Sequence, residues 1–173
     1  MDEIGKERGE GGPRWMPIAT AIVAVLAALI GLLNSQRSTQ ALIQKNEEIA
    51  ALAKASDTYN YYQAKAIKEE LYKGLIVSHR ADPKLQAVVD HEETSKKPVL
   101  EKARDYDREA DAANARSERY LRSHETLEIS VTLLEVAIVI LSISTLAGTV
   151  TLPVIAGLAI LAGIGFAIAG ILT

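Results

Sequence analysis

The chain has 173 residues, no cysteine and a formal net charge of -3. The lack of cysteine excludes disulfides and thiolate metal sites, and one Trp, one Phe and five Pro leave little material for a β-sandwich or a large enzyme core. The charges are unevenly spread, because every acidic and basic residue except Glu135 precedes Ile129.

Residues 1–14 are rich in glycine, mixed in charge and without apolar periodicity, which predicts a disordered tail. Residues 15–33 then carry no charge over 19 positions. Such a helix is about 28 Å long, enough to cross the hydrocarbon core of a bilayer, and Trp15 is placed to anchor it at the interface. A cleaved signal peptide is the alternative, but the run is long and no small-residue cleavage site follows it.

The segment 34–79 has no proline and predicts an amphipathic helix that continues from the first span. Its apolar residues fall at heptad steps and then drift around the helix: Leu42, Ile49, Leu52, Tyr59, Ala66, and after them Ile67, Leu71 and Leu75. Asp82 and Pro83 predict a helix cap and a first helical residue. We expect a short helix over residues 84–93 and an interruption over residues 94–98, which end in Pro98.

A long helix is predicted from Pro98 to about Ala147. Residues at alternating steps of four and three form a seam, as in a coiled coil: Val99, Ala103, Tyr106, Ala110, Ala113, Ser117, Tyr120, His124, Leu127, Val131, Leu134, Ile138 and Leu141. The seam continues from charged into apolar surroundings, which predicts a helix that begins in water and ends inside a membrane.

The two arms predict an antiparallel helical-hairpin stalk over residues 34–126. A turn centred near Ala81 would pair residue 34, which follows the first apolar run, with residue 128, which precedes the second. Equal arms are what a hairpin rooted in one membrane surface requires. The expected fold class is therefore all-α, an integral membrane protein with three transmembrane helices and a coiled-coil stalk.

The second and third spans are predicted at residues 129–148 and 151–172, with a tight turn over residues 148–153. Small residues at four-residue spacing in the third span, Ala159, Gly163 and Ala167, with Gly165 and Ala169 beside them, predict close helix packing within or between chains. Three spans put the N-terminus on one side and the hairpin on the other. The basic residues near the hairpin's roots favour a cytoplasmic hairpin at a bacterial inner membrane.

The most distinctive stretch is Asp57-Thr58-Tyr59-Asn60-Tyr61-Tyr62-Gln63-Ala64-Lys65-Ala66-Ile67-Lys68. It resembles the bacterial membrane-protein family catalogued as domain of unknown function 4337. Members have an aromatic residue and then Tyr-Gln-Ala-Lys-Ser-Ile-Lys on a helix after one N-terminal span, with paired apolar segments at the C-terminus. Tyr59 stands here where many relatives have Trp, and Ala66 where they have Ser. The resemblance implies a membrane protein and no particular activity.

Two interpretations of this stretch are open. Tyr59, Tyr62, Gln63, Lys65 and Lys68 are either a packing node against the returning arm near residues 96–103 or a surface that docks a partner protein or lipid headgroup. Nucleic-acid binding is not expected, because residues 34–126 hold 16 basic and 16 acidic side chains and therefore no basic excess.

Glu135 is the only charged residue within an apolar run. Carboxylates in membrane helices are costly and often functional. It either reaches the headgroup region, or stays protonated against a hydroxyl, or lines an ion path in an oligomer.

No metal, cofactor or catalytic constellation is expected. His79, His91 and His124 are far apart, and Asp90-His91-Glu92-Glu93 predicts a solvated tip because neighbours in sequence do not face one another on a helix. The sequence favours a homo-oligomeric membrane scaffold that contacts lipid and partner proteins. A channel or transporter subunit that uses Glu135 is the alternative, and an enzyme is not expected.

Overall fold

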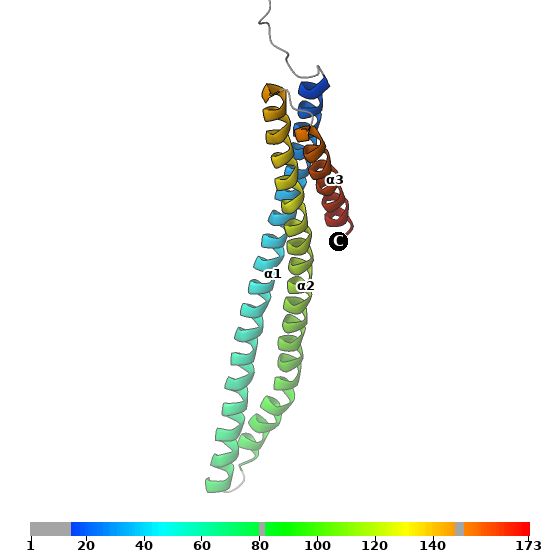
Figure 1. The fold of residues 1–173 in the computed structure, drawn as a ribbon. Helices are drawn as coiled ribbons and strands as arrows, with labels where there is room; N and C mark the ends of the chain where they lie inside the picture. The colour runs from blue at the N-terminus through cyan, green and yellow to red at the C-terminus, as the bar shows by residue number, and fades with distance from the viewer. Residues whose placement is uncertain (1–14, 80–81, 148–150) are drawn as a thin grey trace, which may run out of the picture. The chain divides into compact units, whose positions relative to one another are not determined.

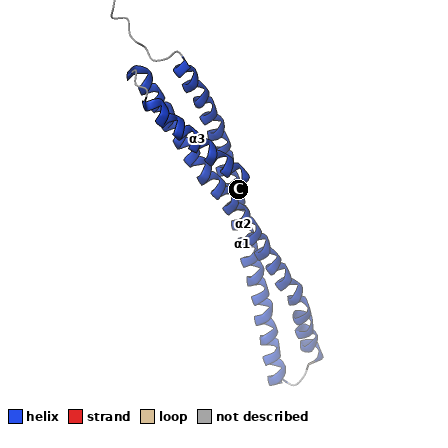
Figure 2. Ribbon diagram, turned by 45° about the vertical axis from the view of Figure 1, so that its right-hand side comes forward, coloured by secondary structure: helices blue, strands red, loops and turns tan. Residues whose placement is uncertain are grey.

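The computed structural model describes residues 15–79, 82–147 and 151–173. Over these residues the chain forms three helices and no strand: α1 (Trp15–His79), α2 (Pro83–Ala147) and α3 (Thr151–Leu172) (Figures 1 and 2). The predicted all-α class is confirmed. The predicted tail 1–14 and residues 148–150 of the predicted turn lie outside the described residues, and residues 151–153 of that turn belong to α3.

Asp82 begins α2 as its cap. Its Oδ1 accepts a hydrogen bond from the backbone N–H of Lys84 at 2.9 Å, and its carbonyl oxygen accepts the N–H groups of Leu85 and Gln86 at 3.0 and 3.1 Å. Pro83 is the first helical residue, where its missing N–H costs nothing. Both roles are those predicted from the sequence.

The predicted interruption at residues 94–98 is wrong, because α2 runs through Pro98 without a break. A proline inside a helix removes one backbone hydrogen bond. The adjacent residues are held by α1 instead: Lys65 donates to the Ser95 hydroxyl at 2.9 Å, and Lys96 donates to Glu69. These tertiary contacts override the local signal of the proline.

The chain divides into two compact units, which we call the charged unit (Leu42–Ser117) and the apolar unit (Met1–Ala41 with Glu118–Thr173). In the charged unit α1 and α2 lie antiparallel, since Lys45 contacts Asn114, Tyr59 contacts Asp107 and Lys68 contacts Glu92. The predicted seam of α2 faces inward here. Ala103, Ala110, Ala113 and Ser117 are buried, and Val99 and Tyr106 are half-buried.

The face of α1 that packs in the charged unit is not the predicted one. Leu42, Ile49 and Leu52 are 65%, 57% and 47% exposed. The inward positions instead follow steps of four and three through small and polar residues: Gln44, Glu48, Ala51, Ala55, Thr58, Tyr62, Lys65 and Glu69. Alanines on both helices allow a close approach, and this face places Gln44, Lys65 and Glu69 within reach of partners on α2.

The apolar unit has a core of Val23 and Ala27 from α1, Leu134, Ala137 and Leu141 from α2, and Ala156 from α3. At its charged end Asn34 Oδ1 lies 2.5 Å from His124 Nδ1. Residue 34 therefore meets α2 about one helical turn before residue 128, the position predicted from equal arms. The prediction assumed that residues equally far from the turn lie opposite each other, whereas side-chain contacts determine which residues pair.

Candidate functional site

The distinctive stretch of α1 lies in the charged unit and is bound to α2 through its lysines. Lys65 Nζ donates to Glu92 Oε2 at 3.0 Å, and Lys68 Nζ donates to Glu92 Oε1 at 2.6 Å. The two lysines are three residues apart and therefore lie on one helix face, where each takes one oxygen of the same carboxylate. The Glu92 side chain is only 5% exposed.

A second buried carboxylate, on α1, is also bound by two lysines, one from each helix. Glu69 of α1 is buried and accepts hydrogen bonds from Lys73 of its own helix and Lys96 of α2. We call Lys65, Lys68, Glu69, Lys73, Glu92 and Lys96 together the lysine–glutamate cluster. Each of the two buried carboxylates is paired twice, which is the condition under which a buried ion pair is tolerated.

These contacts set the protonation states of the cluster. Hydrogen bonds from Lys68 and Lys65 lower the pKa of Glu92 to about 2, and those from Lys73 and Lys96 lower the pKa of Glu69. Hydrogen bonds to Glu92 raise the pKa of Lys65 and of Lys68. The carboxylates stay ionised and the amines protonated at neutral pH, so none is suited to act as a general base or a nucleophile.

The charged unit is expected to lose stability between pH 4.5 and about pH 2. A carboxylate whose pKa is lower in the folded state than its ordinary value of 4.5 stabilises the fold above that value, and this contribution disappears as the pH falls toward the folded pKa. Thermal unfolding of the detergent-solubilised chain, followed by circular dichroism across this range, measures the effect. A Glu92→Gln variant should depend less on pH in the same window, and equal slopes would contradict the assignment.

The tyrosines of the stretch differ in their surroundings. Tyr59 donates its hydroxyl to Asp107 Oδ2 at 2.7 Å, a hydrogen bond that raises the pKa of Tyr59, and Tyr62 is half-buried. Tyr61 is 56% exposed, with Lys65 Nζ at 5.2 Å from its ring centre. Gln63 is exposed. The stretch thus contacts α2 through Tyr59 and its two lysines and leaves Tyr61 and Gln63 exposed.

The sequence did not identify Glu69 or Glu92 as members of this site. The prediction of a solvated tip is wrong for Glu92, because both of its oxygens are bound to lysines of α1. His91 and Glu93 beside it are exposed. In the part of the chain that the structure describes, no group of three or more His, Asp or Glu residues could hold a metal ion.

Small residues join α3 to α2 in the apolar unit. Ser130 Oγ donates to the Gly163 carbonyl at 2.7 Å, and Ser123 Oγ donates to the Gly170 carbonyl at 2.5 Å. A Cβ built on Gly163 would lie 3.1 Å from Leu134 Cγ, and one on Gly170 would lie 2.9 Å from Leu127 Cγ. At both positions even a Cβ would require the facing leucine side chain to move, so a large side chain has no space there.

The other predicted packing residues of α3 are placed differently. Ala167 is buried and Ala159 is half-buried, whereas Gly165 is exposed with open space around it. The face of Gly163 and Ala167 therefore packs within the chain, the first of the two arrangements considered for it.

Glu135 is exposed on α2, away from the core of the apolar unit. It belongs to a row of exposed residues at steps of four and three: Glu128, Thr132, Glu135, Val139 and Ser142. Thr132 and Ser142 donate their hydroxyls to backbone carbonyls of the preceding turn, at 2.9 and 2.7 Å. Among the described residues Glu135 has no hydrogen-bond or ion-pair partner.

Comparison with known proteins gives one match. The family model described as Domain of unknown function (DUF4337) matches residues 13–173. No curated protein and no solved structure matches the chain.

Proposed function

The chain belongs to the family described as Domain of unknown function (DUF4337), and from this premise we propose that it is a membrane-anchored scaffold and not an enzyme. In this proposal the apolar parts of α1, α2 and α3 cross the bacterial inner membrane. The charged unit forms an antiparallel coiled-coil stalk, on the cytoplasmic side, that presents its surface to partner proteins and to other copies of the chain.

The observation that carries the proposal is the division between the two units. All three helices are long and apolar enough to cross a membrane, and each contributes its apolar length to the apolar unit. Large apolar side chains cover the outside of that unit, among them Ile22, Leu29, Val139, Leu158 and Leu161, each at least 56% exposed. So much exposed apolar surface is unfavourable in water and suits a lipid environment.

The charged unit provides two exposed surfaces for partners. Among its described residues, every large apolar side chain that is exposed belongs to α1: Leu42, Ile43, Ile49, Leu52, Tyr61, Ile67, Leu71, Leu75 and Val77. Tyr61 also borders a shallow hollow of about 260 Å³ with Asp57, Thr58, Val99 and Lys102. An apolar row along one helix is a common docking surface for another helix.

The mass of the purified complex tests the scaffold. The chain has a mass of 18.7 kDa, and we expect a defined multiple of it from light scattering with detergent contributions subtracted. Aspartate in place of both Leu42 and Ile49 should yield smaller species if α1 joins the copies. The matched control adds the same two charges at exposed, uncharged positions of α2, Ala112 and Ala115. A wild-type chain that is monomeric and binds no other protein would contradict the proposal.

A channel is the second candidate, and the row containing Glu135 is the observation that favours it. In an oligomer built on this face of α2, Glu128, Thr132, Glu135 and Ser142 would line one path. Carboxylates inside membrane helices are often cation sites.

Planar bilayers that contain the wild type or the Glu135→Gln variant distinguish the two functions. Glutamine keeps the shape of the side chain and removes its charge, so a scaffold should assemble equally well and conduct no current in either form. Reproducible cation currents that disappear in the variant would support the channel and overturn the scaffold.

A further inference from the structure

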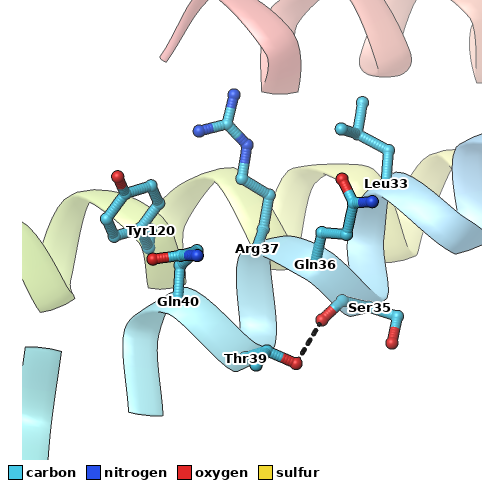
Figure 3. A pocket seen from close by; sticks show the side chains of 7 residues that line it. All are labelled: Leu33, Ser35, Gln36, Arg37, Thr39, Gln40 and Tyr120. Carbon is cyan, nitrogen blue, oxygen red and sulfur yellow. Dashed lines mark hydrogen bonds between the residues drawn. The ribbon is translucent and has the colours of Figure 1, made fainter. Parts of the chain in front are cut away.

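A pocket of about 680 Å³ lies in the apolar unit, next to the charged end of its apolar segments. It is lined by one stretch of α1 and one residue of α2: Leu33, Ser35, Gln36, Arg37, Thr39, Gln40 and Tyr120 (Figure 3). Leu33 is the last residue of the uncharged run, and polar residues follow it directly. The pocket therefore lies at the level where, in the proposed membrane arrangement, hydrocarbon gives way to headgroups.

Arg37 is the cationic side chain of this pocket, and none of the carboxylates in residues 15–79, 82–147 and 151–173 forms an ion pair with it. Its Nε is buried without a hydrogen-bond partner, and its Cζ lies 5.7 Å from the centre of the Tyr120 ring. Three arginines of the described chain have carboxylate partners instead: Arg108 with Asp105, Arg116 with Glu47 at 3.5 Å and Arg122 with Glu118 at 3.5 Å. A buried donor without an acceptor costs free energy, which a ligand that supplies the acceptor would recover.

The Arg37 side chain is half-buried and extends away from its own helix. In Figure 3 it extends from α1 toward the faint red ribbon of α3, and Gln36 extends to the same side. Thr39 lies on the other side, where its hydroxyl donates to the Ser35 carbonyl at 3.0 Å. The groups available to a ligand are thus the guanidinium and the amide of Gln36, with the hydroxyl of Tyr120 at the end of the pocket.

We propose that this pocket binds the phosphate group of an anionic membrane lipid through the guanidinium of Arg37. The planar guanidinium presents several N–H donors in a geometry that matches two phosphate oxygens. The cation–π contact with Tyr120, at 5.7 Å, restricts the side chain before the ligand arrives, which reduces the entropy lost on binding. Lipid phosphates are concentrated at the depth where the apolar runs end. The inference rests on the proposed membrane insertion.

The test measures how many lipids the full chain retains. The wild type, Arg37→Gln and Arg119→Gln are purified in a mild detergent, mixed with phosphatidylglycerol or phosphatidylcholine, and examined by native mass spectrometry. Arg119 is an exposed arginine one residue before the pocket's tyrosine, so its replacement removes the same charge nearby without changing the pocket. We expect Arg37→Gln to bind phosphatidylglycerol about tenfold more weakly, the loss of roughly one charge-assisted hydrogen-bonded pair. Arg119→Gln should bind as the wild type does.

A second arm adds inorganic phosphate in place of lipid and measures thermal stabilisation. If inorganic phosphate stabilises the wild type but not Arg37→Gln, the site binds phosphate and a soluble phosphate is a ligand. If only lipid is retained in an Arg37-dependent way, the ligand is the lipid headgroup. Arg37→Lys keeps the charge but lacks the planar guanidinium, so its affinity for the lipid should lie between those of the wild type and Arg37→Gln. This variant replaces Arg37→Gln in the test if Arg37→Gln does not fold. Equal retention by the wild type, Arg37→Gln and Arg119→Gln would overturn the site. Because all variants are compared after extraction from membranes, that result would leave the membrane proposal intact.

Discussion

Leucine in place of Gly163 or Gly170 is expected to separate α3 from α2. A Cβ alone would come within 3.1 and 2.9 Å of the side chains of Leu134 and Leu127, so a leucine has no space at either position. Each substitution would also displace the carbonyl that accepts from Ser130 or Ser123. Overpacking of this kind costs about 1–3 kcal/mol, and loss of the hydrogen bond adds about 0.6 kcal/mol in a membrane.

The matched control is Gly165→Leu, two residues from Gly163 on the same helix. A Cβ at Gly165 has nothing within 4 Å, so this leucine should change the stability by less than about 0.5 kcal/mol. Unfolding of the detergent-solubilised variants in increasing dodecyl sulfate gives the three free energies. Equal stability of Gly163→Leu and Gly165→Leu would contradict the packing of α3 on α2.

Replacing Glu92 with alanine is expected to loosen the charged unit around the lysine–glutamate cluster. Lys65 is only 12% exposed, and it would keep its charge while losing its carboxylate partner. Removing one member of a buried pair is costly because the other charge remains without compensation. We expect amide hydrogen exchange to accelerate roughly tenfold or more in the two helix segments joined by Glu92, residues 62–72 of α1 and 88–100 of α2.

Glu93→Ala removes the same type of side chain from the adjacent, exposed position and is the control. It should leave exchange in both segments unchanged. Because Glu92 contacts only the charged unit, exchange in α3 should also stay at its wild-type rate in both variants. Acceleration by Glu93→Ala equal to that of Glu92→Ala would show that the lysines are not what holds the two helices together.

The α2 seam could be predicted because its residues alternate at steps of four and three without exception, from Val99 to Leu141. Every one of them is buried or half-buried. The start of α2 was predictable for a similar reason, since the signals of Asp82 and Pro83 are local and depend on no distant residue.

The packed face of α1 could not be predicted in the same way. Its large apolar residues, such as Leu42 and Ile49, form the stronger pattern, yet they are exposed. Burial on this helix is decided by partners on α2: Glu92 holds Lys65, and Lys96 holds Glu69. Such pairs join residues 27 positions apart, so they cannot be predicted from hydrophobic periodicity. The same contacts explain why Pro98 does not end a helix here.

In the proposed function three apolar segments cross a membrane, and the charged unit lies on one side of it. Single cysteines can test this directly, because the native chain has none. They are placed in turn at Glu10, Lys84 and Thr173, and at Val25, Val139 and Leu161 within the three apolar segments. A membrane-impermeant maleimide is then applied to sealed vesicles of each orientation. We expect Lys84 and Thr173 to be labelled from the cytoplasmic face, Glu10 only from the opposite face, and the three apolar positions from neither. Labelling of Glu10 and Lys84 from the same face, or of the apolar positions in intact vesicles, would contradict the proposal.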